Sequence, residues 1–320
     1  TESAPFIVSD GAGGAFVAWE DTRAYVYPTN LNDIYAVHLL GDGSRAPGWP
    51  ENGRPVSTGP LFDAHPQLLV DGAGGVLIAW VYGTPSGSEI RALQLTAAGE
   101  VAPGWVAGGK VVCTAPQGRG NLRLVSDGSG GGYLAWVDYR TAPPGTNPND
   151  LAFYSDIYAQ RFTGTGDIVA GWPSDGLPLC TQPSIQWAVD AAGDGAGGCF
   201  VSWVDYRAYT PNYSDVFALR VRGDGTLAPG WTAQGTRAST AFGFQLTTIL
   251  VADDVGGVYL LIEDYAEDGY KLAAQHLTGT GQLAPGWPAE GVRLVQTVGE
   301  QDQQHAMSDG MGGAIVVWED

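Results

Sequence analysis

Apolar residues are grouped along this chain in short runs that glycine-rich turns separate, and the same order of runs returns about every 60 residues. One run in each repeat is apolar at nearly every position, as in residues 76–80 and 200–203, and the next run alternates, as in residues 157–162. A continuous apolar run predicts a strand buried on both faces, whereas alternation predicts one solvated face. No segment keeps the period of 3.6 residues of an amphipathic helix. We therefore predict an all-β chain whose repeats each hold four short strands, named A to D in chain order.

A glycine-rich motif and two tryptophan positions recur with these strands. The motif Asp-Gly-x-Gly-Gly, intact or degenerate, starts at Asp10, Asp71, Asp127, Asp194, Asp253 and Asp309. A tryptophan ends strand B except in the fifth repeat, where Ile262 replaces it, and a second tryptophan ends a Gly-Trp pair in each complete repeat. Glycine supplies the positive φ of tight hairpins. Four-stranded repeats of this length are typical of a β-propeller, in which neighbouring blades cover each other's faces.

We expect a single β-propeller domain over residues 1–320. Its repeats are approximately residues 1–60, 61–116, 117–182, 183–241, 242–298 and 299–320. The last repeat supplies strands A and B alone. A six-bladed ring with an incomplete last blade is favoured because it buries that hairpin, and a five-bladed ring is the alternative. Exposed edges of a half blade also invite pairing with another chain, which leaves self-assembly open.

Residues 10–23, 127–140 and 194–207 read approximately Asp-Gly-x-Gly-Gly-x-x-Val-x-Trp-x-Asp-x-Arg, and residues 33–36 and 156–159 read Asp-Ile-Tyr-Ala. These stretches resemble a repeat of secreted bacterial proteins. The resemblance covers the whole chain and implies a propeller within a large exported or surface protein, often beside adhesion modules. It implies no agreed activity. We therefore expect a secreted, extracellular or cell-surface location.

The charge balance argues against two kinds of partner. The chain carries 34 acidic and 15 basic side chains, a net charge of -19, whereas binding of nucleic acid needs clustered Lys and Arg. No apolar run approaches the ~18 residues of a membrane span. The chain begins at Thr1 without a signal peptide, which predicts a processed chain or a piece of a longer protein.

The sequence predicts no cofactor and no metal site. The three cysteines, Cys113, Cys180 and Cys199, are too widely spaced for a disulfide framework or a zinc motif, and we interpret them as small buried side chains. Each glycine-rich turn offers one aspartate, which is too few for the 6–8 oxygens that calcium takes. Calcium therefore stays open only as an alternative of low weight.

Long and unequal segments connect strands B and C, which marks one edge of the repeats as the expected ligand face. Aromatic side chains beside amides and carboxylates suit the rings of a glycan, and they suit a protein partner equally well. In the alternative interpretation the tyrosines pack on one another and order the loops. The candidates are Tyr25, Tyr27, Tyr139, Tyr154, Tyr206, Tyr209 and Tyr213, with Trp187, the one tryptophan outside the two repeated positions.

A charged element, Asp-x-Arg, follows strand B in three repeats. Its members are Asp21 with Arg23, Asp138 with Arg140, and Asp205 with Arg207, and the acids Asp33, Asp156 and Asp215 precede strand C in the same repeats. We expect each arginine to face the strand C acid across the hairpin. In the fifth repeat the basic residue has changed strands, so that Asp264 would pair with Lys271. Such an exchange favours a structural ion pair over a cation site or a catalytic carboxylate.

Polar residues of several kinds stand where strand A begins. They are His65, Gln67, Asn121, Arg123, Gln186, Gln245, Asp302, Gln303 and His305. A glycosidase would place two carboxylates at the mouth of the channel, and this set predicts no such pair. We therefore expect no enzyme but a non-catalytic extracellular module that binds a glycan or a protein through the loop face. The alternatives are a carbohydrate-active hydrolase with acids at the channel mouth and an architectural subunit of a surface layer or filament.

Overall fold

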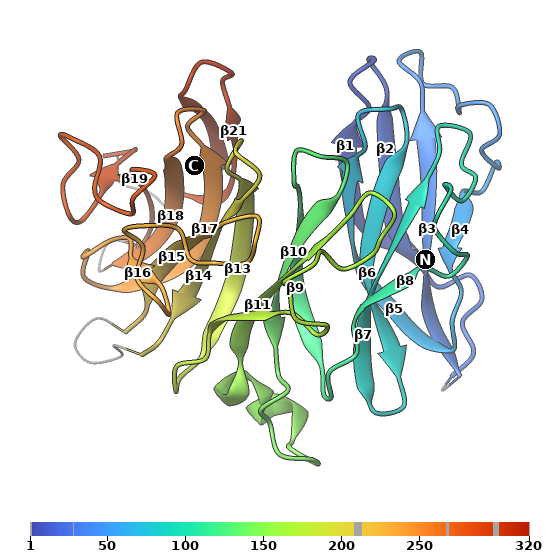
Figure 1. Cartoon of the computed structure of the whole chain (residues 1–320), viewed down its shortest axis with the longest axis horizontal. Helices are drawn as coiled ribbons and strands as arrows, with labels where there is room; N and C mark the ends of the chain where they lie inside the picture. Colours follow the sequence, from blue (N-terminus) through green and yellow to red (C-terminus); the bar gives the residue numbers. More distant parts are fainter. Residues whose placement is uncertain (1, 28, 208–212, 267–268, 297–300, 320) are drawn as a thin grey trace. The chain divides into compact units, whose positions relative to one another are not determined.

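The computed structural model describes residues 2–27, 29–207, 213–266, 269–296 and 301–319. The first eight strands form two antiparallel groups of four (Figure 1). Their bounds are β1 Glu2–Ser9, β2 Ala15–Asp21, β3 Asn30–Leu39, β4 Arg54–Ser57, β5 Leu61–Val70, β6 Val76–Thr84, β7 Gly87–Leu95 and β8 Lys110–Cys113. A short parallel pairing of β3 with β5 joins the two groups into one sheet.

Three further antiparallel sheets of four strands come next, and β21 and β22 form a two-stranded sheet at the end of the chain. The bounds are β9 Arg119–Ser126, β10 Gly132–Asp138, β11 Asp156–Phe162, β12 Leu177–Cys180, β13 Gln186–Gly193, β14 Cys199–Asp205, β15 Asp215–Val221, β16 Thr236–Arg237, β17 Phe244–Ala252, β18 Val258–Ala266, β19 Gly269–Leu277, β20 Val292–Arg293, β21 Asp302–Ser308 and β22 Ala314–Glu319. The prediction of an all-β chain with four strands per repeat is therefore confirmed.

Two compact units divide the chain, with the boundary inside β10 and β11. Unit 1 is Thr1–Leu134 with Gln160–Gly176, and unit 2 is Ala135–Ala159 with Leu177–Asp320. The helix in the described part of the chain is a 3-10 helix, η1 Pro148–Tyr154, which Asn147 caps by accepting a hydrogen bond from the amide of Asn149. No described helix is long and apolar enough to cross a membrane.

Strand B of each complete repeat provides the centre of the core. Every residue of β10 and of β14 is buried, and Trp80, Trp136 and Trp203 have no exposed surface. The second tryptophan of the repeat joins one sheet to the next: the indole N–H of Trp49 donates to the carbonyl of Ala97 at 2.8 Å. Trp105 and Trp231 make the equivalent bond to Gly164 and Gly279. Tryptophan is therefore an architectural residue in this chain.

The glycine-rich motif is an aspartate-centred turn. One carboxylate oxygen of Asp10 accepts the amides of Ala12 and Gly14, both at 2.8 Å, and the other lies 2.9 Å from Nε2 of His38 on strand C. A Cβ at Gly14 would lie 2.2 Å from the carbonyl oxygen of Leu39, so the last glycine of the motif has no substitute. The strand C partner of this aspartate differs between repeats: it is His38, Gln94, Arg161, Arg220 or His276.

Each first strand of a repeat carries an irregularity near its beginning. The register of β5 against β6 shifts between Ala64 and Gln67, and a residue with positive φ occupies the bulge, His65 at 57°. Four other repeats have an equivalent left-handed residue, namely Ala4, Asn121, Ala188 and Gln303, whereas β17 shifts register between Gln245 and Thr247 without one. Non-glycine residues in this conformation are costly and concentrate at functional sites, as do bulges. The bulges therefore direct attention to this end of strand A.

The final hairpin differs from the other repeats in its burial. Ile315 and Val317 of β22 are 53% and 58% exposed, whereas their counterparts in β6, Leu77 and Ala79, are buried. The expectation that a ring covers this hairpin is therefore not supported, and the number of blades stays a prediction.

Candidate functional site

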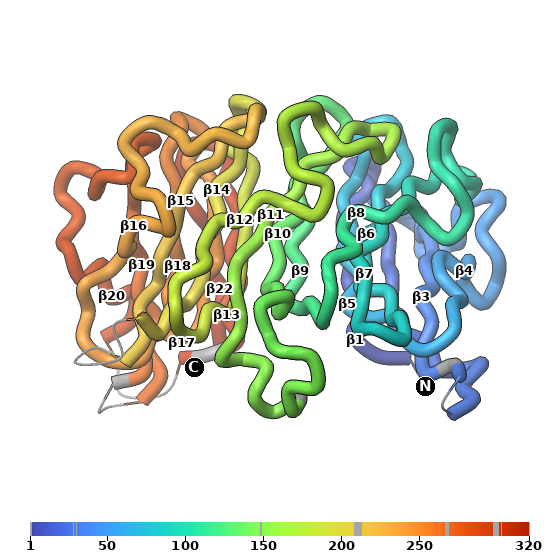
Figure 2. The backbone as a smooth tube through the Cα atoms, turned by 60° about the horizontal axis from the view of Figure 1, so that its bottom comes forward, coloured from blue at the N-terminus to red at the C-terminus, as the bar shows by residue number. Residues whose placement is uncertain are grey.

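A cavity of about 190 Å³ in unit 1 opens between the bulged ends of β1, β5 and β9. Its polar side chains are His65, Gln67, Asn121 and Arg123. Its other walls are Ala4, Pro5, Phe6, Pro66 and Leu122. In Figure 2 the first residues of β1 and the turn after β2 lie at the same end of unit 1, and the pairing of Glu2 with Asp21 agrees with this. The cavity thus lies at the edge of the sheets to which the B–C connections belong.

His65 is exposed, and a residue of the first group of strands, Glu20 on β2, fixes its backbone. The amide of His65 donates to Oε1 of Glu20 at 2.9 Å, and Oε2 of Glu20 accepts from Nδ2 of Asn32 at 2.8 Å. Both oxygens of Glu20 are thereby engaged. The carboxylate stabilises the left-handed turn that presents the imidazole, so Glu20 positions His65.

The other polar groups of the cavity complement the imidazole. Gln67 is buried and donates to the carbonyl of Pro66, and Arg123 donates to the carbonyl of Leu122 at 3.0 Å. Imidazole exchanges protons near neutral pH, and guanidinium is always charged and suits anions. No carboxylate is among the nine residues that line this cavity. The site can therefore move a proton and hold an anionic group.

Three buried carboxyls have raised pKa values but do not line this cavity. Burial raises the pKa of Asp63, of Asp156 and of Asp264 to about 6 in each case. Neighbouring acids add to the shift, such as Asp33 beside Asp63 and Asp215 beside Asp264. All three are almost completely buried. They are groups of the interior, and their titration affects stability.

Replacing Asp63 with asparagine is expected to stabilise the protein at pH 8 by about 2 kcal/mol. Because the folded pKa of about 6 exceeds the ordinary value of 3.8, ionisation destabilises the folded protein as pH rises from about 4 through 6. The advantage of Asp63→Asn should therefore shrink to a small fraction at pH 4, where the folded carboxyl is protonated and the unfolded one, with its ordinary pKa of 3.8, is only partly ionised. Denaturant unfolding at both pH values measures this. An equal gain at pH 4 and pH 8 would contradict the assignment.

The arginines of the Asp-x-Arg element pair differently from the expectation. Arg23 contacts Asp21 at 2.5 Å, two residues before it, whereas we expected Asp33 across the hairpin. The hydrogen bond from Arg23 lowers the pKa of Asp21 to about 2. The same Oδ2 accepts the indole N–H of Trp19 at 2.8 Å, and the guanidinium lies 3.9 Å above the ring of Tyr35. The aspartate thus fixes the tryptophan and the arginine together.

In the third and fourth repeats too, the arginine pairs with the aspartate two residues before it, which again corrects our expectation. Arg140 pairs with Asp138 at 2.7 Å and Arg207 with Asp205 at 2.5 Å, and Trp136 and Trp203 donate to those carboxylates. The strand C acids lie elsewhere. Asp33 and Asp215 are the ladder partners of Asp21 and Asp205, Asp215 pairs with Arg237 at 2.6 Å, and Asp156 accepts from Thr141. Asp264 and Lys271 are ladder partners and both are buried.

The second repeat lacks this aspartate and arranges the arginine in another way. Tyr82 stands in place of the acid, and Arg91 on strand C lies 3.6 Å above the tyrosine ring while it pairs with Glu89 at 2.9 Å. The indole nitrogen of Trp80 then has no hydrogen-bond partner among the described residues. The stacking of an arginine on an aromatic ring is therefore retained even where the ion pair is rearranged.

The structure does not gather the aromatic candidates into one site. Tyr25 and Tyr27 are in unit 1, and Tyr27 is 76% exposed. The remaining candidates belong to unit 2, where Tyr139 and Tyr206 are half-buried and Tyr154, Tyr213 and Trp187 are exposed. Tyr213 stacks on Phe244 with ring centroids 4.4 Å apart, which is the loop-ordering arrangement. Tyr209 lies outside the described residues.

Sequence reasoning missed one repeat position that follows the strand B tryptophan or its replacement. It holds glutamate in the first, fifth and last repeats, namely Glu20, Glu263 and Glu319, and valine in the other three. Glu319 accepts from Nε2 of Gln303 at 3.1 Å. The signal was available from the aligned repeats, because a position that is apolar in half of them and acidic in the other half marks a local functional difference.

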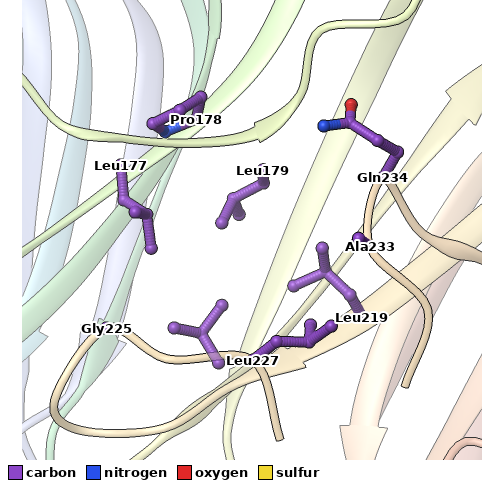
Figure 3. Close-up of a pocket in the computed structure, with 9 residues that line it drawn as sticks. Leu177, Pro178, Leu179, Leu219, Gly225, Leu227, Ala233 and Gln234 are labelled. Carbon is purple, nitrogen blue, oxygen red and sulfur yellow. The ribbon is translucent and has the colours of Figure 1, made fainter.

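A second described cavity, of about 150 Å³ in unit 2, has a different character. Leu177, Leu179, Leu219 and Leu227 point into it (Figure 3), and Gln234 supplies its polar side chain. It contains no titratable group, so it offers no acid, base or charge to a substrate.

Neither a metal nor a reactive thiol is indicated. No group of three His, Cys, Asp or Glu able to hold a metal ion occurs among the described residues. The three cysteines are buried, and burial raises the pKa of the Cys180 thiol to about 12. A thiol that stays protonated is a poor nucleophile.

Comparison with known proteins places the fold. No protein-family model matches the sequence, and no curated protein does either. The structure is similar to a polysaccharide lyase described as PL25-Ulvanlyase, with a TM-score of 0.59 and 9% identity over 95% of this chain and 72% of the lyase. The polysaccharide lyase Uly1 gives a TM-score of 0.55 at 8% identity, over 96% of this chain and 72% of that one. Hadza microbial sialidase Hz136 gives a TM-score of 0.47 at 11% identity. The alignment covers 91% of this chain but only 61% of the sialidase.

These neighbours are β-propeller enzymes, and the fold of this chain is of the same type. They also correct our main functional expectation. We expected a non-catalytic binding or structural module, but the two polysaccharide lyases named above, each with a TM-score above 0.5, are enzymes.

Proposed function

We propose that the protein is a carbohydrate-active enzyme that cleaves an acidic polysaccharide in the cavity of unit 1. One observation carries the proposal: His65, Asn121 and Arg123 converge on one cavity at the bulged ends of the inner strands. A histidine beside an arginine, with no carboxylate in the lining, suits elimination at a uronate better than hydrolysis, which uses two carboxylates. The fold shared with polysaccharide lyases supports the same choice.

The reaction we propose is a β-elimination. A base removes the proton from the carbon next to the uronate carboxylate, the bond from the neighbouring carbon to the bridging oxygen breaks, and a carbon–carbon double bond forms. The departing oxygen takes up a proton, so no water is consumed. His65 is the proton acceptor of the cavity, and Arg123 with Asn121 stabilises the charge that develops on the carboxylate. Glu20 holds the backbone of His65 in place.

The proposal includes two further points. We retain a six-bladed propeller with an incomplete last blade, supported by five four-stranded groups and a final pair of strands. We also retain an extracellular or cell-surface location, supported by the resemblance of the repeats to those of secreted bacterial proteins.

Incubation with polygalacturonate, alginate and ulvan tests the proposed reaction. Elimination creates an unsaturated end that absorbs ultraviolet light, whereas hydrolysis creates a reducing end without it. We expect the unsaturated product from at least one of these polymers. Cleavage without ultraviolet absorbance would exclude elimination, and no cleavage of any acidic or neutral polysaccharide would refute an enzyme of this class.

A second candidate is a glycoside hydrolase that uses the acidic repeat position in unit 2. Glu263 and Glu319 hold equivalent positions on β18 and β22, and Nε2 of Gln304 joins β21 to Thr247, the ladder partner of Glu263, at 2.5 Å. Two acids at equivalent positions of consecutive repeats can act as proton donor and nucleophile or base when both face one substrate. This hydrolase would be established if the protein formed reducing ends without unsaturation, if Glu263→Gln and Glu319→Gln lost this activity, and if His65→Ala kept it.

A further inference from the structure

Unit 1 has another cavity, of about 240 Å³, which shares strand β5 with the cavity of His65. The cavity of His65 is called the first cavity of unit 1, and this one the second. Thr29, Pro60, Leu61, Tyr82, Gly83, Thr84 and Pro85 line it. None of these side chains is charged, in contrast to the first cavity with Arg123. We propose that this cavity is a subsite that holds a further sugar ring of the polysaccharide cleaved in the first; the inference rests on the proposed function.

The aromatic wall of the subsite is fixed before any ligand arrives. The guanidinium of Arg91 lies 3.6 Å from the ring centre of Tyr82, and Glu89 holds Arg91 at 2.9 Å. On Gly59, a Cβ would lie 2.4 Å from the Tyr82 ring, so the backbone there touches the tyrosine closely. A ring held in this way loses little freedom when a ligand packs against it.

The lining suits the shape of a sugar, which has an apolar face of C–H groups and a rim of hydroxyls. Tyr82, Leu61 and the two prolines provide apolar surface, and the hydroxyls of Thr29 and Thr84 stand among them. The Thr84 hydroxyl has an exposed partner, Ser86, at 3.4 Å, so a ligand hydroxyl can replace or join it. Aromatic surface with a few hydroxyl partners is the usual composition of an uncharged ligand site.

The spacing of the two cavities favours one polymer over two separate ligands. Leu61 belongs to the second cavity and His65 to the first, and both are on β5. Four residues of strand span at most about 13 Å, and the left-handed residues Leu61 and His65 shorten this distance. A chain of several sugars is long enough to occupy both cavities, and binding remote from the reacting bond is a general means of raising kcat/KM.

The decisive variant is Thr84→Trp, which fills the second cavity without touching the first. We expect kcat/KM for long chains of the cleaved polymer to fall about tenfold or more, since an apolar contact in a pocket is worth about 10- to 200-fold. The kcat/KM for the shortest cleaved oligomer should stay unchanged. The matched control is Ala73→Trp, on the exposed turn that joins β5 to β6 at their other end and outside the lining of both cavities, which should resemble the unmodified protein.

The outcomes separate this inference from the proposed function. If the unmodified protein cleaves the polymer but Thr84→Trp leaves the dependence on chain length unchanged, the subsite is refuted and the enzyme is not. If no polymer is cleaved, the binding of polygalacturonate, alginate and ulvan to the unmodified protein and to Thr84→Trp is compared by calorimetry. Equal affinities of the two proteins would overturn the inference. Stronger capture of a proline-rich peptide than of any glycan would also overturn it. Thr84→Leu, a smaller filler, serves if the tryptophan variant does not fold.

Discussion

Replacing His65 with alanine is expected to lower kcat/KM for an acidic polysaccharide by about 100- to 10,000-fold, the contribution of a general acid–base group. The fold should be unaffected. Ala4 and Ala188 occupy the equivalent bulge with φ of 45° and 49°, so alanine is a natural occupant of this backbone position. Initial rates with the cleaved polymer, together with the thermal midpoint, measure both effects.

Two controls sharpen this result. His65→Gln keeps a polar side chain that cannot exchange a proton, and it should be as inactive as alanine. Arg123→Lys keeps the charge but loses the planar fork that suits a carboxylate, so KM should rise more than kcat falls. Full activity in His65→Ala would contradict the assignment of the proton acceptor, whatever the stability of the variant.

Replacing Asp205 with alanine is expected to destabilise unit 2 by about 3–5 kcal/mol, the cost of breaking a buried ion pair on one side. Asp205 has no exposed surface, and its loss removes the carboxylate that accepts from both the guanidinium of Arg207 and the indole N–H of Trp203. Among the described residues, Arg207 then keeps only neutral acceptors, the carbonyl of Gln234 and the sulfur of Cys180. Denaturant unfolding followed by tryptophan fluorescence measures the change. The Asp205→Ala variant also tests the corrected pairing, because Asp205 and not Asp215 is the partner of Arg207.

The matched control is an exposed ion pair. Lys110 contacts Asp167 at 2.8 Å, but the Asp167 side chain is 67% exposed, so Asp167→Ala should change stability little. A large loss in Asp167→Ala, or a small one in Asp205→Ala, would contradict the view that burial gives the Trp-x-Asp-x-Arg unit its importance.

Strand order could be predicted because local pattern determines it. Apolar runs ending at Trp80 and Trp203 become the buried strands β6 and β14, and the glycine motif becomes the hairpin before each. The partner of the arginine was also within reach of the sequence. Strand β2 ends at Asp21, and the Asp21 carboxylate accepts the backbone amide of Arg23 at 2.8 Å, so the chain turns there and brings the arginine back to this aspartate. We gave more weight to the exchange of charge between strands.

The candidate site was only half visible in the sequence. His65, Gln67, Asn121 and Arg123 could be singled out by their position before strand A, but no local pattern showed that their bulges meet at one cavity. Bulges depend on the register between two strands, and register is a property of pairing. Glu20 was missed for a related reason, since its bond to His65 joins residues of two different repeats.

The left-handed bulge of strand A allows one side chain to vary while the paired residues around it stay in the sheet. It turns one side chain per repeat out of the ladder, and that position holds alanine, histidine, asparagine or glutamine in the repeats where φ is positive. Residues on either side of it keep their ladder partners, as Ala64 does with Val81 and Gln67 with Ala79. The scaffold therefore accepts different side chains at the bulge position without a change in the strand pairing on either side of it. New specificities can be engineered, and can arise by point mutation, at one residue per repeat with the core left untouched.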